Sequence, residues 1–351
     1  MISFDLVIFG LLALGTASPP RAPLVEPPPT SDLSVFSGPQ RLVSLPGGRR
    51  MNIYCTGSGG PTVILEGGWT SWTSYWRKVQ PAVARTTRVC SYDRAGYGFS
   101  DPGPMPRTAA AIADDLAALL KAAQVPGPYV LVAHSAGALD VRLFASEHPS
   151  QVAAMILVEP AVEYQDRELG LVSKAYAASA AAFARDVQAC AEAVIDNRPM
   201  PGGTAAALCI SPPAQAMPAA VSEAVRKLEL SEGYQRTAAS ELANYGGTSS
   251  AQVEQARHSL GKLPLLVLTA ANSMDDPTLP ADEQAAVTET WWGLHDAVAK
   301  LSTAGKHRLV TGSDHFVPMQ QPQAVIDAIA GMVAGVRATA LPAIAATSPG
   351  H

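Results

Sequence analysis

One serine stands where its neighbours favour nucleophilic chemistry, in the segment 133–137 with the sequence AHSAG. The apolar run 129–132 precedes this segment, and a helix-forming segment, 138–147, follows it directly. A buried strand that ends in a tight turn and continues as a helix pushes the side chain at the turn above the sheet. The helix N-terminus also directs free N–H groups at the same point. Ser135 is therefore the candidate nucleophile.

A serine hydroxyl needs a base within hydrogen-bonding reach, and that base needs a partner that orients it. Of the seven histidines, His315 lies in a loop that follows the last expected strand and precedes a final helical segment, 322–333. We expect this loop to emerge at the same edge of the sheet as Ser135, which makes His315 the candidate general base. His134 is interpreted as a packing residue, because its side chain should point away from that of the neighbouring serine.

Several carboxylates compete for the role of the orienting acid. Glu159 ends an apolar strand and is followed by Pro160, which stops the strand there. A carboxylate on a rigid strand end is better aimed than one on a long loop, which favours Glu159. Asp275 and Asp276, in the loop after the strand 265–269, are the alternative. Two weaker candidates complete the set, Glu163 and Asp314.

The negative charge that develops on an attacked carbonyl oxygen needs two backbone N–H donors. One expected donor is the N–H of Ala136, directly after the nucleophile. The other is expected from the loop after the strand 62–65, whose glycines let the backbone approach a substrate closely; Trp69 is the preferred donor and Gly68 the alternative. This chemistry needs no metal and no organic cofactor, and no Cys–His spacing typical of a zinc site is present in the sequence.

Apolar strand-like segments alternate with helical segments along most of the chain, which predicts an α/β fold with a mostly parallel sheet covered by helices on both faces. The first two strands are expected to form a hairpin turned by Pro46-Gly47-Gly48. The eight expected strands are 41–45, 49–54, 62–65, 87–92, 129–133, 154–158, 265–269 and 307–310, and the expected helices include 74–84, 108–123, 138–147 and 322–333.

The long gap between the sixth and seventh strands has a different composition. Residues 161–261 are rich in Ala, Glu and Arg, with helical periodicity that prolines interrupt at 199–201 and 211–213. We interpret this stretch as a cap of three to five helices inserted into a core formed by 39–160 and 262–337. The cap begins at the carboxyl ends of the strands, where ligands bind in open α/β sheets.

The two ends of the chain differ from this core. An apolar run at 6–14 is followed by small residues, the pattern of a secretory signal peptide, here 1–17, cleaved near Ala17. The run is short for a bilayer span, so no stable membrane insertion is expected after cleavage. The proline-rich segment 18–38 is expected to be a linker without helix or central strand, and 338–351 a flexible tail. A periplasmic or secreted location follows, with a cytoplasmic one as the alternative.

The composition of the chain indicates which classes of partner to expect and whether the cysteines can form disulfides. The chain has 351 residues, 48% of them hydrophobic, a formal net charge of −5 and no basic run, which argues against nucleic-acid binding. An even number of cysteines in an exported chain permits two disulfides, most simply Cys55–Cys90 and Cys190–Cys209. Four buried thiols are the alternative.

From about residue 40 to 335 the chain resembles the α/β-hydrolase superfamily, and within it the esterase-like hydrolases with a helical cap. Five segments carry the resemblance: Glu66–Trp69, Tyr92–Asp101, His134–Gly137, Leu157–Glu159 and Ser313–His315. The resemblance implies an α/β-hydrolase fold, a mostly parallel eight-stranded sheet flanked by helices with an inserted helical cap.

The resemblance also bears on single residues. It implies that the strands carrying Cys55 and Cys90 are neighbours, it gives Arg94 and the preceding aspartate a mainly architectural role, and it supports Glu159 as the acid. The chain departs from the usual family pattern in having Glu66 where a histidine is common. This glutamate would repel an anionic substrate if it faced the pocket.

The resulting interpretation is a serine esterase that cleaves a small-molecule carboxylic ester through an acyl-enzyme intermediate, with Ser135, His315 and Glu159 as catalytic triad. The serine argues against the haloalkane dehalogenases and epoxide hydrolases of the superfamily, which use an aspartate. A C–C bond hydrolase, a lactonase, an aminopeptidase and a non-catalytic binding protein are the alternatives, and homo-oligomerisation stays open. Trp72 and Trp76 are interpreted as structural.

Overall fold

The computed structural model describes residues 32–202, 206–210 and 217–340. Its eight strands form one sheet in the order β1-β2-β4-β3-β5-β6-β7-β8, in which β2 alone runs against the others. The eight strands and the α/β-hydrolase architecture predicted from the sequence are confirmed. The strands are β1 (Leu42–Ser44), β2 (Arg50–Thr56), β3 (Thr62–Glu66), β4 (Val89–Tyr92), β5 (Tyr129–His134), β6 (Val152–Val158), β7 (Leu265–Ala270) and β8 (Gly305–Val310).

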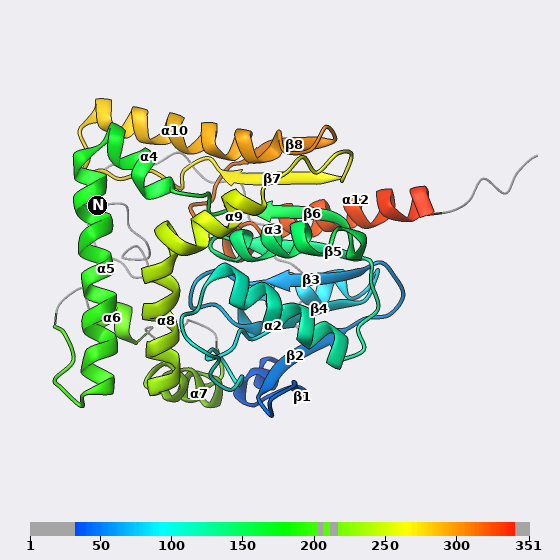
Figure 1. The fold of residues 1–351 in the computed structure, drawn as a ribbon, viewed down its shortest axis with the longest axis horizontal. Coiled ribbons are helices and arrows are strands. Elements are labelled where there is room, and N and C mark those ends of the chain that lie inside the picture. The colour runs from blue at the N-terminus through cyan, green and yellow to red at the C-terminus, as the bar shows by residue number, and fades with distance from the viewer. Residues whose placement is uncertain (1–31, 203–205, 211–216, 341–351) are drawn as a thin grey trace, which may run out of the picture.

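Helices cover both faces of this sheet, because β3, β4 and β5 are buried at every position and alternate residues face opposite sides. On one face, Ile64 and Leu131 pack against α2 (Ala109–Ala122) and α3 (Gly137–Glu147). On the other face, Val63 and Val130 pack against α1 (Gln80–Val83) and α12 (Pro322–Ala340). Figure 1 shows α2 and α3 in front of the sheet and α12 behind it.

The insertion between β6 and β7 forms a helical cap at the carboxyl ends of the strands, and in Figure 1 the arrow of β7 points toward it. Its described part holds six α-helices and one π-helical turn, more than the three to five helices expected. Very short pieces such as α6, which spans four residues, carry too little periodicity to be recognised in a sequence. The elements are α4 (Gln165–Val172), α5 (Lys174–Ile195), α6 (Ala206–Cys209), α7 (Ala219–Glu229), α8 (Glu232–Asn244), the π turn Tyr245–Ser249 and α9 (Ser250–Ala256).

Three local expectations were wrong. Leu33–Ser37 form a 3₁₀ helix with Phe36 buried against the core, although 18–38 was expected to hold no helix. The expected helix 74–84 is broken into the 3₁₀ turn Thr73–Trp76 and α1, since Pro81 lacks the N–H that a continuous helix needs. The last helix, α12, continues to Ala340 and so extends into the expected tail.

The expected signal peptide, residues 1–17, and the first part of the expected linker lie outside the described residues, as does the end of the tail from 341. Among the residues that are described, no helix combines the length and apolar character needed to cross a bilayer.

Both disulfide pairings named from the sequence are confirmed. Cys55 on β2 and Cys90 on β4 are register partners on adjacent antiparallel strands and are joined by a disulfide. Cys190 on α5 is joined to Cys209 on α6, which ties two cap helices together. All four cysteines are therefore used, and none is free.

A buried relay of hydrogen bonds lies between β7, β8 and α10 (Ala281–Ala299). His295 on α10 donates from Nε2 to the carbonyl of Pro160 at 2.8 Å, and its Nδ1 is 2.5 Å from the hydroxyl of Thr269. That hydroxyl is 2.8 Å from Nε2 of His307. Burial lowers the pKa of His295 to about 3, so the ring is neutral near pH 7.

Removal of the Cys55–Cys90 disulfide is expected to lower stability. The bond closes a chain segment with a sequence separation of 35 residues, which corresponds to about 4 kcal/mol of lost chain entropy in the unfolded state. Chemical denaturation of the double variant Cys55→Ala/Cys90→Ala should show this loss. The Cys190→Ala/Cys209→Ala variant, with a separation of 19, should lose somewhat less. An unchanged denaturation midpoint in the first variant would contradict the prediction.

His295 is expected to make the protein sensitive to acid. The unfolded chain takes up a proton at this histidine below about pH 6.5, whereas the folded chain does so only near pH 3. The stability from this group is therefore complete above pH 6.5 and falls by up to about 1.4 kcal/mol per pH unit as the pH drops toward 3. Denaturation of His295→Gln between pH 7 and pH 4 should show a shallower slope than wild type.

The exposed His258 in the cap supplies the matched control for this measurement, because solvent reaches its ring in the folded protein as well. His258→Gln should keep the wild-type dependence of stability on pH. Equal slopes for wild type and His295→Gln would disprove the assignment.

Candidate functional site

Ser135 lies at the turn between β5 and α3 in a left-handed backbone conformation, with φ at 52°. A non-glycine residue in this region is strained and needs support from its surroundings. Here the N–H of Ser135 donates to the carbonyl of Val158 at 3.1 Å, and its carbonyl accepts from the N–H of Ala161 at 2.9 Å. The neighbouring strand thus holds the turn that presents the hydroxyl.

The turn also depends on close approach by the loop after β3. A Cβ atom added to Gly137 would overlap the carbonyl of Gly67, and one added to Gly68 would come within 3.0 Å of Cβ of Ser135. Glycine at these positions lets the loop lie directly against the serine. The sequence therefore brings two chain segments into contact where a substrate carbonyl would sit.

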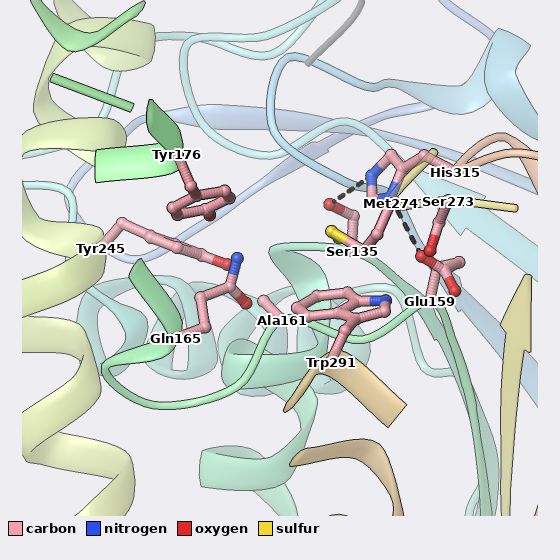
Figure 2. A pocket seen from close by; sticks show the side chains of 10 residues that line it. All are labelled: Ser135, Glu159, Ala161, Gln165, Tyr176, Tyr245, Ser273, Met274, Trp291 and His315. Carbon is pink, nitrogen blue, oxygen red and sulfur yellow. Dashed lines mark hydrogen bonds and ion pairs between the residues drawn. The ribbon is translucent and has the colours of Figure 1, made fainter. Parts of the chain in front are cut away.

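His315 bridges the serine and a carboxylate (Figure 2). Its Nε2 is 2.9 Å from Oγ of Ser135, and its Nδ1 is 3.4 Å from Oε2 of Glu159. In the arrangement that fits these contacts, the serine hydroxyl donates to Nε2 and the imidazole donates from Nδ1 to the carboxylate. The structure brings together the three residues named from the sequence, in an order that allows the serine proton to pass to the imidazole.

Glu159 is held rigidly at the end of β6. Its backbone is left-handed, with φ at 47°, and its N–H donates to the carbonyl of Leu268 at 2.7 Å. One carboxylate oxygen accepts the N–H of Ala270 at 2.5 Å, while the other faces His315. Complete burial raises the pKa of Glu159, and hydrogen bonding to His315 works in the opposite direction.

The alternative acids have other partners. Asp275 is exposed and accepts the side-chain amide of Asn272 at 2.7 Å, and Asp276 accepts the backbone N–H of Thr278 at 2.8 Å. Both carboxylates thus stabilise turns within their own loop. Glu163 forms a bidentate ion pair with Arg142, and Asp314 accepts the N–H of Phe316. Glu159 is the carboxylate that lies against Nδ1 of His315.

The two backbone N–H groups expected to serve as oxyanion donors have no protein acceptor among the described residues. Across the described chain, neither the N–H of Ala136 nor that of Trp69 donates to a backbone or side-chain oxygen. Ala136 immediately precedes α3, where orphan N–H groups are a normal feature of the helix end. These are the two donors expected from the sequence, and whether they hold an oxyanion stays a prediction.

Glu66 is not among the residues that line the pocket, so the condition for its repulsion of an anionic substrate is not met. Its side chain is 1% exposed, its carboxylate forms a 2.7 Å ion pair with Arg94, and it accepts the hydroxyl of Tyr92. Burial is the main cause that raises the pKa of Glu66, to about 7, against the opposing effect of Arg94. The carboxyl group is thus part of the framework behind the loop that follows β3.

His134, interpreted from the sequence as a packing residue, also makes a hydrogen bond to the loop that carries His315. Its ring stacks on Tyr75, and its Nε2 lies 2.9 Å from the backbone carbonyl of His315. Burial lowers the pKa of His134 well below its usual value, so the neutral ring donates to this carbonyl. The residue before the serine therefore supports the loop that carries His315. The sequence contained no signal for this contact, because the two residues are 181 positions apart.

A pocket opens next to the serine, with one end formed by the triad candidates and the other by cap residues (Figure 2). Aromatic and uncharged polar side chains dominate its wall, as is common for small-molecule sites. The lining residues are Ser135, Glu159, Ala161, Gln165, Tyr176, Tyr245, Ser273, Met274, Trp291 and His315. The indole of Trp69 is not part of this wall; it lies between the core and the cap and donates to the carbonyl of Ala238. Trp72 and Trp76 are buried structural residues, as predicted.

Within the ranges that the structure describes, no group of three or more His, Cys, Asp or Glu side chains is arranged to hold a metal ion.

Comparison with known proteins places these elements in a family. A family model described as alpha/beta hydrolase fold matches residues 61–194, which include Ser135 and Glu159. Among curated proteins, the uncharacterized protein YqjL of Bacillus subtilis is 35% identical over 106 residues. This match covers 30% of the present chain and 42% of YqjL, so less than half of the relative's length is shared.

Solved structures extend the likeness to most of the chain. An esterase from Thermogutta terrifontis is 21% identical, with a TM-score of 0.53, and the alignment covers 84% of this chain and 98% of the esterase. The epoxide hydrolase CorEH is 17% identical, with a TM-score of 0.58 and coverage of 85% and 99%. At such identities the likeness concerns the fold. Together, the family match over residues 61–194 and the sheet topology show that the chain has an α/β-hydrolase fold.

Proposed function

We propose that this hydrolase cleaves carboxylic esters through an acyl-enzyme intermediate. The observation that carries the proposal is the chain of contacts from Oγ of Ser135 through His315 to Glu159. Epoxide hydrolases of this superfamily, such as CorEH, resemble the chain in fold. A serine at the nucleophile position favours acyl transfer, because a hydroxyl with an adjacent base forms an acyl-enzyme that water can hydrolyse.

The proposed reaction has two half-reactions. Oγ of Ser135 bonds to the carbonyl carbon, its proton passes to Nε2 of His315, and the carbonyl electron pair moves onto the oxygen, which the N–H groups of Ala136 and Trp69 stabilise. The C–O bond to the alcohol then breaks, and His315 returns the proton to the leaving alcohol. In the second half, His315 takes a proton from water as water attacks the acyl carbon, and gives it back to Ser135.

The pocket wall favours neutral substrates. Of its ten lining residues, Glu159 is the one acidic side chain, and no Lys or Arg is among them. A substrate group that enters the pocket meets Trp291, Tyr176 and Met274, which can bury apolar atoms. We therefore propose esters with an uncharged acyl or alcohol group as substrates.

The disulfides support the proposal that the protein functions in an oxidising compartment. Both bonds use all four cysteines, and such bonds persist mainly in exported proteins. A periplasmic or secreted location accords with this use of cysteine.

Substitution of the nucleophile tests the proposed mechanism. Ser135→Ala is expected to lower kcat/KM for p-nitrophenyl esters by about a millionfold, because the acyl-enzyme no longer forms. A fluorophosphonate should label the wild-type peptide that contains Ser135 and leave the variant unlabelled. Thermal unfolding of the variant serves as the folding control. Ester turnover that survives in a folded Ser135→Ala protein would rule out the mechanism, and turnover of amino-acid amides in place of esters would favour an aminopeptidase.

Substitution of the acids tests the role of Glu159. Glu159→Gln is expected to lower kcat by about a thousandfold to ten-thousandfold, because the amide no longer holds the imidazole in the productive tautomer. The matched variants Asp275→Asn and Asp276→Asn should keep kcat near the wild-type value, since their carboxylates bond within their own loop. Steady-state kinetics on one p-nitrophenyl ester compares all three. A collapse of activity in an aspartate variant alone would transfer the acid role to that residue.

A further inference from the structure

Arg94, in the loop after β4, uses its whole guanidinium group inside the protein. The residue is 1% exposed, and each of its five N–H bonds has an acceptor. The contacts run from Nη1 to Oε1 of Glu66 at 2.7 Å and the carbonyl of Gly67 at 2.7 Å, from Nη2 to the carbonyl of Gly68 at 2.8 Å and Oε2 of Glu241 at 3.0 Å, and from Nε to Oε1 of Glu241 at 3.1 Å.

Two of these contacts fix the loop beside Ser135. The C=O and N–H of one trans peptide point in opposite directions. A bond from Arg94 to the carbonyl of Gly68 therefore sets the direction of the Trp69 N–H, and the bond to Gly67 does the same for the N–H of Gly68. These N–H groups are the two alternatives for the second oxyanion donor. Arg94 thus controls the orientation of either one without contacting the substrate.

The remaining contacts come partly from the cap. Glu241 lies on α8, is 7% exposed, and binds Arg94 through both carboxylate oxygens. The hydroxyl of Tyr97 donates to the same carboxylate at 3.0 Å. One turn earlier on α8, the carbonyl of Ala238 accepts the indole N–H of Trp69. One cap helix is therefore linked to the oxyanion loop by two routes.

Electrostatics make Arg94 and its two carboxylate partners depend on one another. Glu66 and Glu241 are both buried and share the charge of Arg94. A buried carboxylate is costly without a cation, and a buried guanidinium is costly without carboxylates. Loss of Glu241 would leave Arg94 with Glu66 as its only carboxylate partner at bonding distance among these contacts, and the guanidinium would be free to tilt away from the carbonyls of the loop.

We propose that Glu241 and Arg94 are positioning residues for the oxyanion hole, so that docking of α8 on the core aims the second N–H donor at the substrate. The cap thereby contributes to catalysis through Arg94 as well as to the pocket wall. This inference depends on the proposed serine chemistry, because an oxyanion forms only if Ser135 attacks a carbonyl.

Three variants of graded severity test the proposal. Glu241→Gln keeps the size of the side chain but places an amide that cannot accept the full set of guanidinium bonds. Arg94→Lys supplies three donors in place of five. Tyr97→Phe removes a single hydrogen bond to Glu241 and gives the mildest change, which keeps the test informative if a stronger variant does not fold. The control is Asp115→Asn, which breaks a buried ion pair with Arg107 outside these contacts.

The main readout is the inhibition constant of a trifluoromethyl ketone, which forms a hemiketal oxyanion with the serine. Loss of one oxyanion donor costs about a hundredfold to a thousandfold in kcat, and a misaimed donor should cost less. We expect Glu241→Gln and Arg94→Lys to weaken the inhibitor and lower kcat in parallel, by about tenfold to a hundredfold, with KM little changed. Tyr97→Phe should show a smaller effect in the same direction, and Asp115→Asn should lose stability without these kinetic changes.

Hydrogen–deuterium exchange supplies a readout that does not require turnover. The peptide that covers Gly67–Thr70 should exchange faster in Glu241→Gln than in wild type, while the peptide covering β5 should be unchanged. The proposal is overturned if the folded variants keep wild-type inhibitor affinity and exchange. A wild-type protein that forms no adduct with the trifluoromethyl ketone would instead refute the proposed serine chemistry and this inference with it.

Discussion

Two strained turns on adjacent parallel strands define the site. β5 and β6 pair with His134 opposite Val158, so the next residue of each strand, Ser135 and Glu159, leaves the sheet at the same level. Both residues have left-handed backbones although neither is glycine. Hydrogen bonds between neighbouring strands hold both turns in place. Because hydroxyl and carboxylate project at one edge, a single imidazole can reach both, and the proposed chemistry depends on this matched pair of turns.

The cap contributes residues both to the pocket wall and to the contacts behind the oxyanion loop. It supplies the aromatic wall of the pocket through Tyr176 and Tyr245, and it reaches the framework behind the oxyanion loop through Glu241. The polar contacts of Arg94 are buried on both sides, so core and cap are joined by directed bonds in addition to apolar packing. Substrate selection and transition-state stabilisation therefore share one structural unit in the proposed function.

Local patterns in the sequence predicted the fold and the residues of the site well where those patterns were strong. The eight strands, the turn at Ser135, the loop at His315 and the strand end at Glu159 follow from apolar runs and from the residues that stop them. Contacts between distant side chains left no such pattern. Arg94 was read as architectural and His134 as packing, because their partners, Glu241 and the His315 carbonyl, lie more than 140 residues away. The sequence left open whether Glu66 faces the pocket, since only the folded chain shows its buried ion pair with Arg94.

The position of the proposed acid, Glu159, directly after β6 leaves the loop after β7 without a role in proton transfer. The loop after β7 contributes Ser273 and Met274 to the pocket, and its aspartates accept hydrogen bonds within their own turns. An enzyme with its acid in that loop would have to conserve the loop's length and path. Here Ser273 hydrogen-bonds the carboxylate of Glu159, whereas Met274 and the residues after it can diverge while Ser135, His315 and Glu159 stay in place. Natural or laboratory evolution can therefore change substrate preference through this part of the loop with little effect on the catalytic rate.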